Sequence, residues 1–226
     1  MPQPGTEELA AQPAEPGARP GRPRRYDPAR ERSLLLDAAS AVLGTKGWAS
    51  VTVADILGEA GLATRSFYRH FASKDELLRS LVRRDAERFA AAVTARVDAA
   101  PAPGAALVVW LDEILGFGYD RRRAQRAAVL RAATAHGALA PDELRRAVLL
   151  LQAPLAATLA AGAADGSFPG AEPEGDAPLV SAMAWDTAGR MAEVAAPAAK
   201  AGLRAGLIAL VERAVGTPIA STTPST

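Results

Sequence analysis

Two short helical patterns separated by a glycine constrain this chain more than any other feature. Thr52 precedes an apolar-periodic run over residues 53–60, Gly61 follows that run, and a second short run spans residues 64–71. Threonine is a common helix cap, Asp55 suits the positive end of a helix dipole, and glycine adopts the left-handed conformation that ends many helices. Two helices joined by so tight a turn predict a helix-turn-helix.

The second of these helices has one apolar side and one polar side. Phe67 and Phe71 lie four residues apart and define the side that packs. The opposite side carries no acid, which suits a helix that enters the major groove of DNA. Its residues are Thr64, Arg65, Ser66, Arg69 and His70. We interpret this side as a DNA-reading surface, and a solvated helix face is the alternative.

Helical patterns also flank this pair. Residues 28–46 repeat apolar positions at three-and-four spacing, and glycines punctuate their end. Ser73 and Glu76 have the spacing of a capping box, which predicts a longer helix that runs to about residue 97. Residues 26–78 are therefore expected to form one helical DNA-binding domain.

Residues 47–78 resemble the DNA-binding signature of the TetR (tetracycline-repressor-like) family, and the resemblance extends over residues 29–78. It is carried by the Gly47-Trp48 pair, the Thr52 cap, the Ala60-Gly61 turn, the Phe67-Tyr68-x-His70-Phe71 run and the Ser73-Lys74-Asp75 start. It implies an all-helical homodimer with an amino-terminal three-helix DNA-binding unit. It also implies a larger helical domain that dimerises and binds a small-molecule effector.

The resemblance assigns roles to individual residues of this unit. It implies that Thr52, Tyr68 and Lys74 contact phosphates of a double-stranded DNA operator, and that Thr64, Arg65 and Ser66 face bases. Arg65 is suited to a bidentate contact with guanine, worth about 1–3 kcal/mol of discrimination. Arg69 and His70 are expected at the DNA backbone, with packing inside the unit as the alternative for His70.

Two positions depart from the family pattern. Ala63 stands where a capping serine or threonine is usual, so the recognition helix is open to a start one residue later with Thr64 as its cap. Gly58 lies inside the first helix of the pair, where it lowers helix stability by about 1 kcal/mol relative to alanine.

The amino-terminal third of the chain is basic. Residues 19–74 contain ten lysines and arginines against five acids, whereas the chain as a whole has a net charge of +1. Residues 1–25 are rich in proline and glycine and predict a flexible arm, in which Arg22, Arg24 and Arg25 form a basic cluster. Contact with DNA phosphates or the minor groove and a solubilising tail are alternative roles for this arm.

The back half also has helical periodicity. Residues 79–216 are expected to form an effector-binding and dimerisation domain, followed by a tail over residues 217–226. Helices are predicted from residue 105 onward, at 124–135, at 141–161, at 177–195 and at 199–215, with a loop over 165–178. The last two helices are rich in alanine and glycine, and the resemblance implies that they form the dimer interface; packing within one chain is the alternative.

An effector pocket is expected between the helices of residues 105–161. Its candidate lining residues are the aromatic and polar side chains Trp110, Phe117, Tyr119, His136, Gln152 and Trp185, each of which has ordinary core or surface packing as its alternative.

Composition excludes several other functions. The chain has no cysteine and only two histidines, which rules out thiolate catalysis and sites built on several cysteines or histidines, and we expect no metal and no cofactor. Signature motifs of hydrolases, nucleotide-binding enzymes and metalloproteases are absent, so we expect no catalytic residues. No signal peptide is visible, and the uncharged stretch 147–164 is interrupted by Pro154, which favours a buried helix over a membrane span.

These observations predict a cytoplasmic, ligand-responsive repressor that a small molecule releases from a palindromic operator. The alternative is a dimeric DNA-binding regulator with no small-molecule effector.

Overall fold

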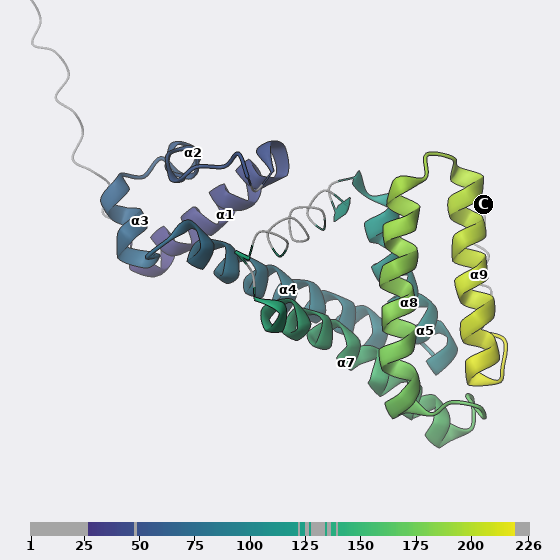
Figure 1. Ribbon diagram of the computed structural model, residues 1–226. Helices are drawn as coiled ribbons and strands as arrows, with labels where there is room; N and C mark the ends of the chain where they lie inside the picture. Colours follow the sequence, from purple (N-terminus) through teal and green to yellow (C-terminus); the bar gives the residue numbers. More distant parts are fainter. Residues whose placement is uncertain are drawn as a thin grey trace, which may run out of the picture.

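The computed structural model describes residues 27–47, 49–121, 123–124, 127, 134, 137–138 and 140–219. Within these residues the chain forms eight α-helices and no strand. The predicted all-α fold class is therefore confirmed, with a helix-turn-helix at the amino-terminal end and a larger set of helices behind it (Figure 1).

Three helices make up the amino-terminal unit: α1 (Pro28–Lys46) and the two shorter helices α2 (Val53–Ala60) and α3 (Thr64–His70). The turn between α2 and α3 forms as the sequence predicts. Thr52 caps α2, and Gly61 ends it in the left-handed region at φ 63° and ψ 34°. A residue with a Cβ adopts that conformation at a cost, whereas glycine does not.

Helix α4 (Lys74–Asp98) joins the two halves of the molecule. Its first turns place Leu77, Leu78, Leu81 and Val82 in the hydrophobic core of α1–α3, and its last turns place Val93 and Val97 in a second core. The Ser73 hydroxyl accepts from the Glu76 amide at 3.1 Å, as predicted, but the Glu76 carboxylate accepts from the Ala72 amide at 2.7 Å. Ser73 therefore caps α4, and the reciprocal bond falls one residue before the expected position.

The second core lies among α5 (Pro103–Tyr119), α7 (Pro141–Asp165), α8 (Pro173–Glu193) and α9 (Pro197–Val215). Helix α8 begins earlier than the sequence pattern suggested, so the prediction of a loop over 165–178 is wrong beyond residue 172. Pro173 occupies the first turn of α8, where its missing amide is not needed, and two acids follow it in that turn. Proline and acids therefore mark a helix start here, although together they also suit a loop.

Several expectations concern the edges of the described chain. The predicted arm, residues 1–25, and most of the predicted helix 124–135 lie outside the described residues. The predicted tail starts with packed residues, because Ile219 is 1% exposed and its amide donates to Glu212 Oε1 at 3.1 Å. The remainder of that tail, residues 220–226, lies outside the description.

Helix α7 is the one described helix that is long and apolar enough to cross a membrane. Length and composition alone support that reading, and a core helix of a soluble protein meets the same test. Leu151, Leu155 and Leu159 on one side of α7 are buried, with the last two in the second core together with α5 and α8. Pro154 lies inside α7, and its carbonyl accepts from the Thr158 hydroxyl at 2.8 Å.

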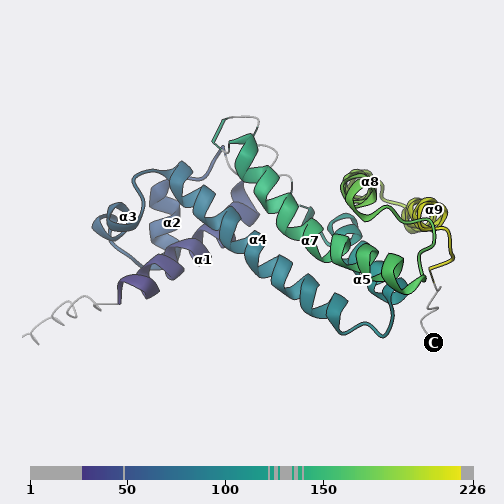
Figure 2. The same ribbon diagram turned by 90° about the horizontal axis from the view of Figure 1, so that it is seen from below.

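The two halves lie at opposite ends of the molecule. In two perpendicular views α3 occupies one end and the α8–α9 pair the other, with α4 and α7 running between them (Figures 1 and 2). Helix α3 is therefore far from α8 and α9.

Candidate nucleic-acid interface

The orientation of α3 is fixed by its two phenylalanines. Phe67 is 0% exposed and Phe71 is 1% exposed, and their ring centroids lie 5.8 Å apart within the first core. Burial of this side turns Thr64, Arg65 and Tyr68 to solvent. Tyr68 is 61% exposed, and its ring forms a T-shaped pair with that of Phe67, with the centroids 5.3 Å apart.

The first turn of α3 differs from two expectations. Helix α3 begins at Thr64 with Ala63 as its N-cap, so the alternative in which Thr64 is itself the cap is wrong. Thr64 is helical and exposed, and its hydroxyl remains on the outer side. Ser66, by contrast, is only 9% exposed, because its position in the turn points it towards the first core. This burial argues against the base-facing role expected for Ser66.

Arg69 and His70 meet a buried acid. Arg69 Nη1 donates to Glu31 Oε2 at 2.9 Å, and His70 Nε2 lies 3.2 Å from the same oxygen. The Glu31 side chain is 7% exposed and that of His70 is 9% exposed, whereas that of Arg69 is 49% exposed. His70 therefore takes the packing role that was left open for it, and Arg69 is already engaged by α1.

Sequence reasoning missed Glu31, although a signal for it exists. Glu31 lies four residues before Leu35, on the same stripe of α1 that buries Ala38, Ala39 and Val42. An acid on a buried stripe requires a partner, since an unpaired buried carboxylate is costly. The partners come from α3, 38 and 39 residues later, and spacing alone does not identify them.

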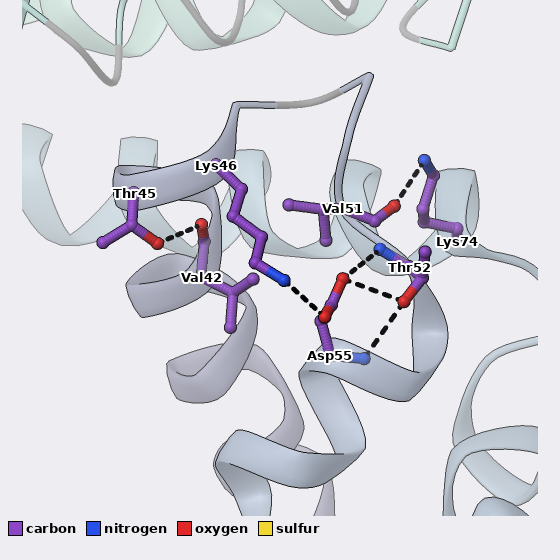
Figure 3. Close-up of polar contacts among 7 residues, drawn as sticks. All are labelled: Val42, Thr45, Lys46, Val51, Thr52, Asp55 and Lys74. Atoms are coloured by element: carbon purple, nitrogen blue, oxygen red, sulfur yellow. Dashed lines mark hydrogen bonds and ion pairs between the residues drawn. The ribbon is translucent and has the colours of Figure 1, made fainter.

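The start of α2 is held by a capping box around Thr52 (Figure 3). The Thr52 hydroxyl accepts from the Asp55 amide at 3.1 Å, and the Thr52 amide donates to Asp55 Oδ2 at 2.9 Å. Lys46, which donates to Asp55 Oδ1 at 2.5 Å, and then the Thr52 amide and hydroxyl lower the pKa of the Asp55 carboxyl from 3.8 to about 2. The amides of Val53 and Ala54, in the first turn of α2, have no partner within the helix.

Lys74 lies at the start of α4, beside the same loop (Figure 3). Its Nζ donates to the Val51 carbonyl at 2.9 Å, and the residue is half-buried. The ammonium therefore ties α4 to the segment that precedes α2. This contact holds Lys74 near Thr52, the other residue at this edge for which a phosphate contact is expected.

Four residues of the predicted sites fall outside the described chain. Arg22, Arg24 and Arg25 of the arm and His136 of the expected effector pocket are among the undescribed residues. Trp48, the aromatic residue of the family signature, is also undescribed. Their predicted roles stay predictions.

The candidate pocket residues separate into three environments. Trp110 is fully buried, and its Nε1 donates to the Leu151 carbonyl at 2.7 Å, as expected of a core residue. Tyr119 is 51% exposed, with the Lys200 ammonium 5.7 Å from its ring centroid. Gln152 is half-buried on α7, and no described contact brings it to the aromatic residues.

Phe117 and Trp185 do lie together, with ring centroids 5.0 Å apart. Phe89 of α4 joins them, with its ring centroid 5.3 Å from that of Phe117, and the Arg123 guanidinium lies 5.4 Å from the Phe89 ring. The sequence did not single out Phe89 or Arg123. We call Phe89, Phe117, Arg123 and Trp185 the aromatic cluster.

Two buried polar atoms on α8 accompany this cluster. Ser181 Oγ and Trp185 Nε1 are both buried, and neither has a hydrogen-bond partner in the described structure. They are four residues apart and therefore lie on the same side of the helix. Buried polar groups nearly always have hydrogen-bond partners. Two such atoms without a partner therefore indicate a position where a ligand or a water molecule can bind.

Known proteins match the amino-terminal helices of this chain in sequence. Residues 35–81 match the family model described as bacterial regulatory proteins, tetR family. A 52-residue segment is 42% identical to the HTH-type transcriptional repressor KstR2 of Mycobacterium tuberculosis, over 23% of this chain and 26% of that relative. The match thus spans about a quarter of the length of the curated relatives.

Solved structures share the fold over most of the chain. A TetR transcription regulator from Haloarcula marismortui superposes with a TM-score of 0.70 at 20% identity, over 84% of this chain and 98% of that one. A transcriptional regulator from Saccharomonospora viridis in complex with choline gives 0.69 at 19% identity, over 81% and 96%. The capped helix-turn-helix lies within residues 35–81, which are similar to the tetR family of bacterial regulatory proteins, and the solved regulators share the fold of the larger part of the chain.

Proposed function

We propose that this protein is a DNA-binding transcriptional repressor that a small molecule releases from a palindromic operator. The observation that carries this proposal is the outward side of α3. Thr64, Arg65 and Tyr68 are exposed there, on a helix whose other side is anchored by two buried phenylalanines. A rigid, acid-free helix of this kind is suited to base edges in the major groove.

Phosphate contacts are proposed for the edges of this surface. Tyr68 is exposed and carries a hydroxyl, and Lys74 carries an ammonium. Thr52 caps a helix start whose first amides have no partner within the helix. Arg65, exposed and without an ion pair among the described residues, is the proposed reader of a base. Phosphate contacts give affinity that depends on salt, whereas base contacts give sequence preference.

Gel-shift or anisotropy titrations over a salt series test these roles. Lys74→Ala and Tyr68→Phe should weaken binding to every sequence, and Lys74→Ala should lower the salt slope by about one. Arg88→Ala is the matched control, since Arg88 is exposed on the same helix and lies about 20 Å farther along it at 1.5 Å per residue. A changed sequence preference with an unchanged salt slope in Lys74→Ala would contradict the assignment.

Dimerisation is proposed through α8 and α9. A groove between these helices is lined by the apolar residues Met183, Leu203, Leu207 and Leu210 and by the charged residues Asp186, Arg190 and Glu193. A twofold dimer doubles the contacts that one protomer makes on a palindrome. Leu203→Glu should convert the dimer to a monomer in sedimentation experiments, with unchanged helicity and weaker operator binding. A wild-type chain that sediments as a monomer would contradict this part of the proposal.

The aromatic cluster is the proposed effector site. Its rings supply an apolar wall, and Ser181 Oγ and Trp185 Nε1 supply two unpaired donors beside it. The solved regulator from Saccharomonospora viridis is in complex with choline, which supports a small molecule as the effector class. A thermal-shift screen of metabolites, followed by release assays, tests this proposal, and Trp185→Phe should weaken any hit by removing one donor.

A regulator without an effector is the second candidate. It is favoured by Trp110, because that predicted pocket residue is fully buried and hydrogen-bonded within the core. Stabilisation of the protein by a metabolite that also releases DNA would exclude this candidate. In either case we propose a regulatory role and no catalytic one.

A further inference from the structure

The buried carboxylate of Glu31 is the feature that the proposed function does not yet use. Its oxygen Oε2 lies 2.9 Å from Arg69 Nη1 and 3.2 Å from His70 Nε2. The next residue of α1, Arg32, places its guanidinium 5.1 Å from the Phe71 ring centroid. Two side chains of α1, Glu31 and Arg32, therefore make three contacts with the carboxyl-terminal end of α3.

Helix α3 depends on contacts of this kind. It has seven residues, and its N-cap, Ala63, makes no side-chain capping bond. A helix so short is unstable alone and takes its position from tertiary packing. Phe67 and Phe71 attach one stripe of α3 to the core, while Arg69 lies off that stripe. A contact to Arg69 therefore restrains rotation of α3 about its own axis.

The Glu31 contact engages some of the basic side chains of α3 and leaves another without an acidic partner in the described part of the chain. Arg69 and His70 share the Glu31 carboxylate, whereas Arg65 has no ion pair among the described residues. The half-exposed Arg69 is thus partly neutralised at the protein surface, and Arg65 carries the positive charge of the outward side. Loss of the Glu31 charge would release Arg69 and make this end of the molecule more cationic.

We infer that Glu31 is a positioning residue for the recognition helix, one that increases sequence selectivity while it limits non-specific attraction to DNA. The inference rests on the proposed function, because it assumes that α3 reads an operator. It differs from a purely structural role in one measurable respect. A structural defect weakens specific and non-specific binding together, whereas loss of this charge should move them in opposite directions.

The test compares Glu31→Gln with Asp37→Asn. Both remove one negative charge from α1, but Asp37 is exposed and pairs with Arg84 of α4 at 2.7 Å, away from α3. Affinities are measured for the selected operator and for a scrambled duplex of equal length over a salt series. Glu31→Gln should lower operator affinity about tenfold and leave scrambled-duplex affinity equal or higher, since hydrogen bonds to buried charges are among the stronger ones. Asp37→Asn should leave the ratio of the two affinities unchanged.

A second variant covers the case in which Glu31→Gln fails to fold. Arg69→Gln keeps the Glu31–His70 contact and should lower operator affinity more than scrambled-duplex affinity. Parallel losses on both duplexes in Arg69→Gln would make Arg69 a plain phosphate contact and overturn the inference. An unchanged ratio in a folded Glu31→Gln protein would overturn it as well. If the unmodified chain binds no selected duplex, the proposed function fails and takes this inference with it.

Discussion

The two ends of this molecule are built in different ways. At the α3 end, capping residues, a left-handed glycine and two phenylalanines fix a small helical unit of 47 matched residues within 35–81. At the α8–α9 end, long helices rich in alanine and glycine pack with few capping signals. Local sequence signals therefore specify the first end, whereas packing between distant segments specifies the second.

This contrast explains why the first end matches known proteins by sequence and the second by structure. The amino-terminal unit is recognisable by sequence, at 42% identity to a curated repressor. The larger part of the chain matches solved regulators by fold, at 19–20% identity over 81–84% of its length. A sequence match depends on individual residues, whereas a helical domain can keep its fold with many different side chains.

The largest expected effect on stability comes from removing a buried aromatic side chain at the α3 end. Phe67→Ala empties a fully buried position and should lower the free energy of unfolding by about 3–5 kcal/mol, as measured by urea denaturation. Tyr68→Ala is the matched control, since Tyr68 is 61% exposed on the same helix. Equal losses from both variants would mean that α3 is not oriented as described.

The sequence indicated much of this end in advance. Thr52, Gly61, Phe67 and Phe71 act as their residue types and spacing predicted. The burial of Ser66 and the partners of Glu31 were not predictable, since both depend on how helices that are distant in the sequence pack together. Spacing along a helix gives the side on which a residue lies but not what covers that side.

A close helix crossing makes the back half sensitive to small additions. A Cβ at Gly118 of α5 would lie 2.5 Å from Met191 Cβ and 2.8 Å from the Ala188 carbonyl oxygen of α8. Gly118→Ala should therefore destabilise the protein by about 1–3 kcal/mol, despite the higher helix propensity of alanine. A melting temperature equal to or above that of the wild type would show that α5 and α8 are less closely packed.

The opposite outcome is expected for a glycine at the other end. Gly58 lies inside α2, and a Cβ there would meet nothing within 4 Å. Gly58→Ala should raise the free energy of unfolding by about 0.5–1 kcal/mol, because alanine loses less conformational entropy in a helix. Thermal melts of Gly58→Ala and Gly118→Ala side by side measure this contrast directly, and destabilisation by Gly58→Ala would contradict it.

The smallest effect concerns pH at the α2 cap. Lys46 and Thr52 lower the pKa of Asp55 to about 2 from 3.8, so the ionised carboxyl favours the folded state. This contribution is complete above the unfolded pKa and is lost as the pH falls from about 4 to about 2. Asp55→Asn should flatten the dependence of stability on pH in that window, as followed by circular dichroism. If stability depends on pH in Asp55→Asn as it does in the wild type, the Asp55 carboxylate does not stabilise the cap.

The pocket end was the harder one to predict. Six candidate residues were expected to line one site. Of the five that the structure describes, Trp110 is core, Tyr119 is exposed, and only Phe117 and Trp185 are in contact with each other. Their companions Phe89 and Arg123 come from a different helix and from the segment after α5. Aromatic residues carry no periodic signal that tells which of them meet across helices.

Selection of bound fragments from random duplex DNA by the full chain tests the central claim most directly. We predict enrichment of an inverted repeat whose half-sites lie about one helical turn, or a multiple of it, apart. Repetition with Arg65→Ala should relax one base position in each half-site. Recovery of no enriched sequence, together with no gel retardation at low ionic strength, would contradict the claim that α3 reads base pairs.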